Sequence, residues 1–306
     1  MFQALALALL LAASATASGN TLPLGSAHVV VVDDASGEVL LQKDAGTAAP
    51  IASLTKLMTA MVVLDAGQDM REIVRIDDAD RDTLKHTRAG VRIGALVPRD
   101  ALLELTLLAS DNHAAAALAR SFPGGNAAFA QALQRKANAL GLSQTTLVEA
   151  TGLSPLNHAS ALDMAKVLQA TTAYPLIAQV TSRRALEVHI NGAPTQVRNT
   201  NRLVGSPGWD ILSSKTGFTN DAGRCLTMRL RAGGRTVSLV LIGAQAPSVR
   251  ARDAMTIRRW LDGQAPAHAR APAAPRTRSA IKVLSEAQLA QVAQVAHTSD
   301  TLRDAL

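Results

Sequence analysis

The chain has 306 residues, of which 48% are hydrophobic, 20 are glycine and 12 are proline. This length is enough for one large domain or two small ones with a buried core, and the ordinary glycine and proline content excludes collagen-like and wholly disordered chains. The formal net charge is +7, but aromatic residues make up only 2% of the chain, which is too little stacking surface for a reader of single-stranded nucleic acid, so we expect no nucleic-acid partner.

An apolar run over residues 2–13 opens the chain, and small residues follow it as far as Ser18. A run of this length suits the core of a secretory signal peptide and is too short to span a bilayer. Ala15-Thr16-Ala17 has the small-x-small form of a cleavage site. Residues 1–17 are therefore predicted to be a signal peptide, and the protein to be exported to the periplasm. A buried N-terminal helix is the alternative, because the α-amine is the only positive charge before the run.

Strand patterns cluster at the two ends of the body of the chain. Residues 28–33 and 38–41 flank a turn at 34–37 as one hairpin, and residues 224–231 and 235–242 flank Gly233-Gly234 as another. Residues 211–219 read as a further strand. Helical patterns between them cover residues 55–66, 99–109, 114–122, 126–140 and 162–170. This order predicts an α+β fold, in which one central antiparallel sheet is built from both ends of the chain and a helical lobe is inserted.

The composition changes after Trp260. Residues 264–279 are rich in Pro, Ala and Arg and are predicted to be a linker, and residues 280–306 a short helical tail that opens on a capping-box pattern at Ser285. Residues 281–306 carry a net charge of −1, which makes them a poor membrane anchor. We expect residues 18–263 to form the catalytic domain, no segment to span a membrane, and the tail to dock to a protein partner in the cell envelope.

Metal and disulfide chemistry are not expected from this sequence. Cys225 is the only cysteine, so no intramolecular disulfide can form, and a lone cysteine in a strand is predicted to be an inert core residue. The seven histidines show no H-E-x-x-H pattern and no paired spacing, so we expect no metal site.

Three short motifs follow one another along the chain: Ser53-Leu54-Thr55-Lys56, Ser110-Asp111-Asn112 and Lys215-Thr216-Gly217. Taken singly, the first two motifs are weak evidence for an active site, because the segment at Ser279 also fits S-x-x-K and the segment at Ser18 also fits S-x-N. Their contexts differ, since Ser279 falls in the predicted linker and Ser18 at the expected cleavage site.

Ser53 precedes an apolar segment at residues 54–64, which places it at the start of a helix. Ser53 and Lys56, three residues apart, would then share one helix face and touch. A lysine can remove the proton of a serine hydroxyl if burial and a second cation lower its pKa, and Lys215 could be that cation. The alternative role of Ser53 is an ordinary helix N-cap.

The other two motifs have plain structural alternatives as well. Ser110-Asp111-Asn112 joins two apolar helices, so it either presents polar side chains to a site or forms an ordinary turn. Lys215-Thr216-Gly217 lies on a predicted strand, either as an exposed lysine or beside a substrate whose backbone could lie against Gly217, which lacks a side chain.

Together the three motifs resemble those of the penicillin-recognising serine enzymes. The wider segments 49–59, 151–166 and 215–226 look like the low-molecular-mass penicillin-binding proteins, and most like their D-alanyl-D-alanine endopeptidase branch. The resemblance covers roughly residues 27–262. It implies a β-lactamase/transpeptidase-like fold, peptidoglycan peptides and β-lactams as ligands, and no metal or organic cofactor.

The resemblance also implies three catalytic roles. Ser53 would attack a D-Ala carbonyl to give an acyl-enzyme, Lys56 would take its proton, and Ser110 would relay a proton to the leaving amine. Five further residues would bind the substrate: Asn112 at the amide of the acyl side, Lys215 and Thr216 at a carboxylate on the leaving side, Gly217 beside the substrate backbone, and Phe218, whose N–H would share the oxyanion hole with that of Ser53.

Four alternatives remain. A class A β-lactamase needs a glutamate in an E-x-x-L-N pattern; here Leu153 occupies that place and Glu149 lies too far back, so penicillin should stay attached. A non-catalytic wall-binding protein would not need all three motifs, and a Ser-His-Asp hydrolase is disfavoured because no G-x-S-x-G occurs. The fourth alternative is a carboxypeptidase that trims stem pentapeptides. Such relatives usually carry a second β domain and a basic anchor, which the residues after Gly263 lack, so cleavage of crosslinks is favoured over trimming of stem peptides.

Overall fold

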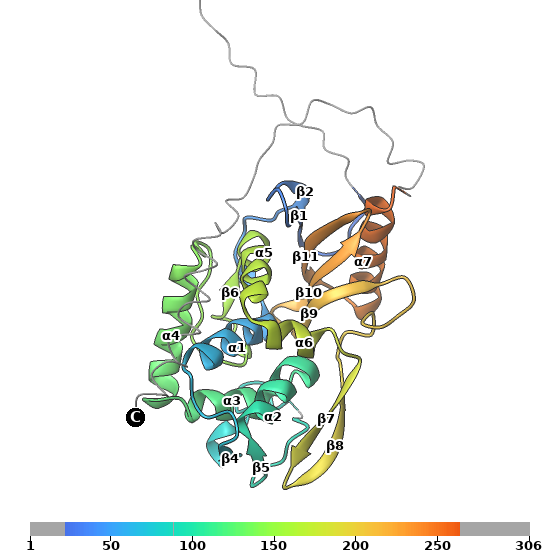
Figure 1. The fold of residues 1–306 in the computed structure, drawn as a ribbon. Helices are drawn as coiled ribbons and strands as arrows, with labels where there is room; N and C mark the ends of the chain where they lie inside the picture. The colour runs from blue at the N-terminus through green and yellow to red at the C-terminus, as the bar shows by residue number, and fades with distance from the viewer. Residues whose placement is uncertain (1–21, 88, 264–306) are drawn as a thin grey trace, which may run out of the picture.

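The computed structural model describes residues 22–87 and 89–263. Its framework is a five-stranded antiparallel sheet in the order β2-β1-β11-β10-β9 (Figure 1). The strands are β1 (His28–Asp33), β2 (Val39–Lys43), β9 (Asp210–Thr219), β10 (Gly223–Ala232) and β11 (Arg235–Ala244). Both predicted hairpins and the predicted strand before the second one are present.

Strand β1 joins the two ends of the chain. It pairs with β11 along its whole length, from His28 opposite Ile242 to Asp33 opposite Val237. The four valines at positions 29–32 are fully buried, which means that both faces of this strand are covered. The prediction of one sheet assembled from distant parts of the chain is therefore confirmed.

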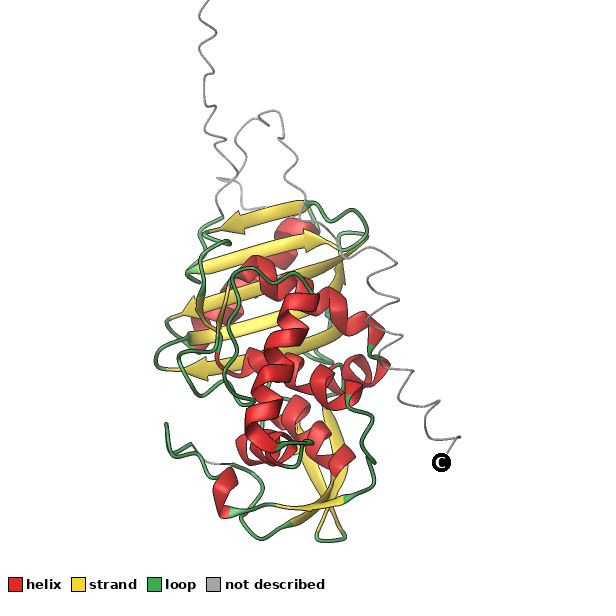
Figure 2. Cartoon of the chain, turned by 90° about the vertical axis from the view of Figure 1, so that its left-hand side faces the viewer, coloured by secondary structure: helices red, strands yellow, loops and turns green. Residues whose placement is uncertain are grey.

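Helices cover both faces of the sheet, which is thus the middle of three layers (Figure 2). Helix α7 (Pro247–Leu261) packs on one face, against β10 and β11, with Ala254 and Ile257 in the core. Helices α1 (Lys56–Asp65) and α5 (Ala161–Ala170) lie toward the other face, where α5 contacts β1, β10 and β11. The sequence did not predict α7.

The helical lobe extends from the sheet on the side opposite α7. Its further helices are α2 (Arg99–Glu104), α3 (Asn112–Arg120), α4 (Gly125–Ala139) and α6 (Pro175–Thr181). Three small two-stranded pairs complete it: β3 (Ala49–Pro50) with β6 (His158–Ala159), β4 (Ile73–Arg75) with β5 (Leu96–Pro98), and β7 (Ala185–Ile190) with β8 (Ala193–Arg198). The five predicted helices are present, whereas α6 and these small sheets were not predicted.

The helix predicted over residues 99–109 changes its winding halfway. It is an α-helix to Glu104 and a wider π-helix over Leu105–Ala109, and it ends at Ser110, which has the left-handed φ of 60°. The next residue, Asp111, is the N-cap of α3. This change of winding and the left-handed residue place the Ser110 motif in a tight turn between two buried helices.

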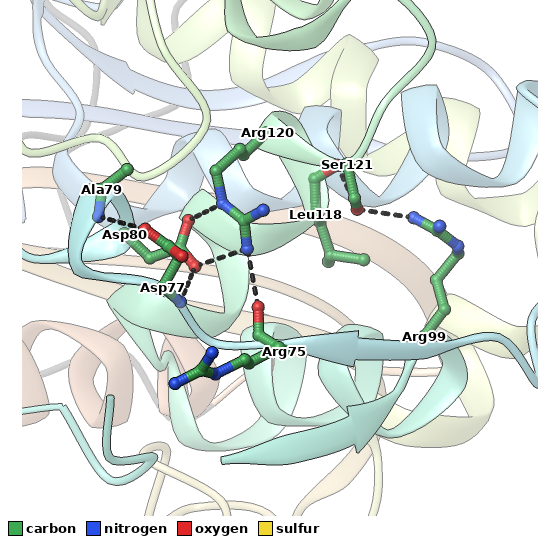
Figure 3. Close-up of polar contacts among 8 residues, drawn as sticks. All are labelled: Arg75, Asp77, Ala79, Asp80, Arg99, Leu118, Arg120 and Ser121. Atoms are coloured by element: carbon green, nitrogen blue, oxygen red, sulfur yellow. Dashed lines mark hydrogen bonds and ion pairs between the residues drawn. The ribbon is translucent and has the colours of Figure 1, made fainter. Parts of the chain in front are cut away.

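Ion pairs hold the far end of α3 (Figure 3). Arg120, its last residue, binds both carboxylate oxygens of Asp80 at 2.8 and 2.9 Å and donates to the backbone carbonyl of Arg75 at 2.7 Å. The buried Arg99 donates to Ser121 at 2.8 Å. The long connection between β4 and β5 is thereby fastened to the helix whose other end carries the second motif.

Several predictions fall on residues outside the described part of the chain. These are the signal peptide at residues 1–17, the linker at 264–279 and the tail at 280–306, all of which stay predictions. Within the described residues, no helix has the length and apolar composition to cross a membrane.

Candidate active site

Ser53 lies in a single 3₁₀ turn, Ala52–Thr55, which leads directly into α1. Lys56 is the first residue of that helix, and its Nζ lies 2.9 Å from Ser53 Oγ. The contact expected from the three-residue spacing is therefore present. The helix start also directs backbone N–H groups toward Ser53, which favours negative charge there.

A chain of hydrogen bonds fixes the orientation of the Asn112 amide. Burial by itself raises the pKa of Asp82, but hydrogen bonds from the Thr87 side chain and from backbone amides outweigh it and lower that pKa. An ionised Asp82 only accepts, so the Thr87 hydroxyl, 2.6 Å away, donates to it and accepts from Asn112 Nδ2 at 2.7 Å. The amide oxygen of Asn112 therefore faces Lys56.

The amine of Lys56 has three hydrogen-bond neighbours, two of which can only accept. Nζ lies 2.7 Å from the Asn112 amide oxygen and 2.7 Å from the carbonyl oxygen of Thr151, both of which can only accept. A neutral amine uses its two N–H groups on these two acceptors, and its lone pair then faces Ser53 Oγ. This is the arrangement of a base ready to take the serine proton.

Burial shifts the pKa values of both lysines of the site. Lys56 is fully buried, which lowers its pKa to about 8, although Glu149, Asp111 and Asp82 act in the opposite direction. The pKa of Lys215 is lowered well below its usual value, first by burial and then by the charge of Lys56. The sequence suggested that burial and the charge of Lys215 together lower the pKa of Lys56; burial is the main cause, and Lys215 is not among the causes.

Lys215, of the Lys215-Thr216-Gly217 motif, contacts Ser110, of the Ser110-Asp111-Asn112 motif. Its Nζ lies 2.7 Å from Ser110 Oγ, so the edge strand β9 and the turn before α3 meet at this contact. The turn is held by the buried carboxylate of Asp111, which accepts from the backbone N–H groups of Ala114 at 2.9 Å and Val91 at 3.0 Å. Asp111 is the N-cap of α3 and thus supports its two motif neighbours.

Thr216, Gly217 and Phe218 continue along β9 beside the nucleophile. The hydroxyl of Thr216 is 2.7 Å from that of Thr200, a residue outside the three motifs. A Cβ on Gly217 would lie 3.1 Å from the backbone nitrogen of Ser53, a tighter contact than a Cβ usually makes, so glycine favours this close approach of the strand to the serine. Phe218 is 45% exposed, and the guanidinium of Arg224 lies 3.5 Å from its ring centre.

The loop 149–157 packs against the nucleophile turn, Ala52–Thr55, and supports it. The carboxylate of Glu149 accepts from the backbone N–H groups of Thr151 at 2.6 Å and Gly152 at 2.7 Å, so it is occupied in folding this loop. Asn157 accepts through its backbone carbonyl from Ile51 at 3.1 Å and donates from its side chain to the Glu149 carbonyl at 2.8 Å. Neither residue has the arrangement of a β-lactamase deacylation base.

All eight residues singled out in the sequence lie at or beside this one site. Sequence reasoning missed the residues that orient them, namely Asp82, Thr87 and Thr200. Asp82 and Thr87 stand in the long β4–β5 connection, where no periodic pattern marks them. The N-cap role of Asp111 could have been found, since an aspartate directly before an alanine-rich helix is a common cap.

Cys225 is buried in β10, opposite Gly217, and burial raises the pKa of its thiol to about 11. A thiol with so high a pKa is a poor nucleophile, in agreement with the predicted core role. The described residues contain no group of histidine, cysteine, aspartate and glutamate side chains arranged to hold a metal ion.

Comparison with known proteins gives concordant results. The family described as D-alanyl-D-alanine carboxypeptidase matches residues 14–246. A D-alanyl-D-alanine endopeptidase of Pseudomonas aeruginosa is 39% identical over 241 residues, which are 78% of this chain and 78% of the relative. Another of that name, from Escherichia coli, is 40% identical over 253 residues, 82% of this chain and 81% of the relative.

A similar fold occurs in solved structures. A DD-transpeptidase of Streptomyces superposes with a TM-score of 0.73 at 24% identity, over 79% of this chain and all of that one. This likeness concerns the fold alone, and it confirms the predicted α+β, transpeptidase-like architecture.

Proposed function

The chain belongs to the D-alanyl-D-alanine carboxypeptidase family of serine peptidases, and we propose that it is a D-alanyl-D-alanine endopeptidase, which cleaves peptide crosslinks of peptidoglycan. The observation that carries the chemistry is the position of Lys56 Nζ, 2.9 Å from Ser53 Oγ, with its other two hydrogen bonds going to groups that only accept. The two relatives named endopeptidases, at 39% and 40% identity, support the choice of substrate.

The proposed reaction has two halves. Lys56 takes the proton of Ser53 as Oγ attacks the carbonyl carbon of D-Ala, and the N–H groups of Ser53 and Phe218 bind the oxyanion. The amine leaves with a proton relayed through Ser110, which gives an acyl-enzyme ester. Water then hydrolyses this ester and frees Ser53.

Substrate placement follows from the same contacts. Asn112 would hold the amide on the acyl side, because its orientation is fixed by Thr87. Lys215 and Thr216 would meet a carboxylate on the leaving side, and the backbone of Gly217 would lie beside the substrate backbone. A β-lactam would occupy the same positions and remain attached as a stable ester.

Trimming of stem pentapeptides is the second candidate, since the matching family is described as a carboxypeptidase family. The test uses purified protein with a crosslinked muropeptide dimer and, separately, with a pentapeptide monomer, and the products are separated by chromatography. We expect dimer cleavage to be the faster reaction and to disappear in Ser53→Ala. Release of D-Ala without any cleavage of the dimer would refute the endopeptidase assignment.

We also propose that the protein is exported to the periplasm, where its substrate lies. Support comes from the apolar run and the Ala15-Thr16-Ala17 pattern in the sequence. Mass spectrometry of the secreted protein should give a chain that starts near Ser18. A mature N-terminus at Met1 would contradict export by this route.

A protein partner in the cell envelope is proposed for residues 280–306, on the strength of the linker that precedes them. Pull-down from envelope extracts with the full chain and with a chain ending at Gly263 tests it. Identical partner sets for the two chains would remove the idea.

A further inference from the structure

A cavity of about 300 Å³ adjoins Ser110 on the side of the helical lobe. One wall is the catalytic turn, with Ala109, Ser110 and Asp111, and the other is the β7–β8 hairpin. Thr195 and Val197 of β8 line it on that side. No step of the proposed reaction uses this space, although its size lies at the lower end of the range for ligand sites.

The cavity shares Ser110 with the proposed leaving-group site. Ser110 lines it and also contacts Lys215, which would bind the carboxylate on the leaving side. Thr200 lies two residues beyond the end of β8. Its hydroxyl accepts a hydrogen bond from the Thr216 hydroxyl at 2.7 Å, and its N–H donates to the Leu108 carbonyl at 3.2 Å. The segment from β8 to Thr200 therefore links the cavity wall to Thr216.

The lining suits part of a peptide. Side chains of Leu105, Ile190 and Val197 supply apolar surface, while Thr195 supplies a hydroxyl group. The carboxylate of Asp111 is already taken by backbone N–H groups, so it is not left as an unpaired charge. A single D-Ala held at Lys215 and Thr216 would leave this space empty, whereas a leaving group that is itself a peptide would extend into it.

We propose that this cavity, the hairpin pocket, binds the leaving peptide strand of a crosslinked substrate. Thr195 is its specificity-determining residue, because it stands midway along the β8 wall. The assignment rests on the proposed endopeptidase function. It explains how one active site serves both a compact β-lactam and a branched peptide, since only the second enters the pocket.

The test fills the pocket with one bulky side chain. Thr195→Trp places an indole in it, and His189→Trp is the matched control. His189 is exposed and pairs with Pro194 on the same hairpin, and as the neighbour of Ile190 it points to the opposite face. For each protein, three rates are measured: cleavage of the crosslinked dimer, release of D-Ala from the pentapeptide, and acylation by fluorescent penicillin.

In Thr195→Trp we expect dimer cleavage to fall at least tenfold while the other two rates change by less than threefold. In His189→Trp all three should stay within twofold of wild type. If all three rates of Thr195→Trp stay near wild type, or if all fall together, the pocket does not select the leaving strand. If the wild type trims the pentapeptide and leaves the dimer intact, the proposed function itself is wrong, and the pocket assignment with it.

Discussion

At the scale of single residues, the chemistry depends on which atoms around Lys56 can donate. The Thr87 hydroxyl donates to Asp82 and therefore accepts from the Asn112 amide nitrogen. The amide oxygen of Asn112 then accepts a hydrogen bond from one N–H of Lys56. A protonated Lys56 would have three N–H groups, and its third would point at Ser53 and block proton transfer. The polar chain thus gives the neutral amine a function that burial alone would not.

The first prediction concerns the identity of the nucleophile. Ser53→Ala should abolish covalent labelling by fluorescent penicillin, because Ser53 Oγ lies 2.9 Å from the amine of the buried Lys56, the proposed base. Ser279→Ala, which changes the other S-x-x-K serine, is the control and should label like wild type. Labelling that survives in Ser53→Ala and disappears in Ser279→Ala would reverse the assignment.

The second prediction follows from the pKa of Lys56, which burial lowers to about 8. The base is the deprotonated amine, so acylation should rise with pH through this value. About a tenth of the amine is neutral at pH 7 and about nine-tenths at pH 9, which gives a rise of roughly tenfold. Acylation rates measured from pH 6 to pH 10, with circular dichroism to confirm folding, check this.

Lys56→Arg is the matching substitution. It keeps the positive charge, but the guanidinium has no accessible neutral form, so acylation should fall by roughly 10² to 10⁴ at every pH. An active Lys56→Arg protein, or a wild-type rate that is flat between pH 7 and pH 9, would rule out the base role.

At the scale of elements, the nucleophile turn is supported by the loop 149–157. Gly152 has a φ of +79°, and a Cβ there would overlap the carbonyl of Ala52, the residue before the nucleophile. The loop and the turn therefore touch backbone to backbone, with no side chain between them. Asn157 ties the same two segments through Ile51 and Glu149.

This contact predicts different results for two glycine substitutions. Gly94 has a similar φ of +87° but has no heavy atom of another residue near its Cβ position. Gly94→Ala should therefore cost only the left-handed strain of about 1–2 kcal/mol, whereas Gly152→Ala should cost several kcal/mol more through overlap with Ala52. Thermal unfolding measures both.

Acylation by penicillin should separate the two variants as well. It should slow at least tenfold in Gly152→Ala, because the displaced turn carries Ser53, and stay near wild type in Gly94→Ala. Equal losses of stability and rate in the two proteins would show that the loop does not position the turn.

The elements that the sequence predicted are those with strong local patterns. The two hairpins have turn residues between buried strands, and the contact of Ser53 with Lys56 follows from helix geometry alone. The β7–β8 hairpin was missed although Asn191-Gly192 between alternating residues is a typical turn for it. The contact of Thr87 with Asn112 could not be predicted, because it depends on how a long connection folds back over α3.

At the scale of the whole molecule, helix α7 is tied to the rest of the body by side-chain hydrogen bonds. Asp253 in α7 accepts from the backbone N–H groups of Gly25 at 3.0 Å and Ser26 at 2.6 Å, so this helix is fastened to the first strand. Asp262 accepts from the Gly233 N–H at 3.0 Å in the β10–β11 turn. These contacts make α7 part of the catalytic body, and the domain boundary just after it stays a prediction.

A chain that ends at Gly263 should therefore fold, unfold cooperatively and react with penicillin at nearly the wild-type rate. A chain that ends at Ala246 is the control; it loses α7, exposes Leu226 and Met228 on one face of the sheet, and should aggregate. Size-exclusion chromatography and acylation rates check both. Aggregation of the first chain would mean that residues beyond 263 pack on the body.

The pairing of β1 with β11 also governs the order in which the molecule can be completed. Partners in these strands are separated by more than 200 residues, so the central pair cannot form until β11 is available to fold. Lys215 lies in β9, more than 100 residues after Ser110, so Ser110 has no Lys215 beside it until that strand is available. A nascent chain therefore remains catalytically silent until nearly all of it is available to fold, and a chain threaded unfolded through a membrane would gain its activity only on the far side.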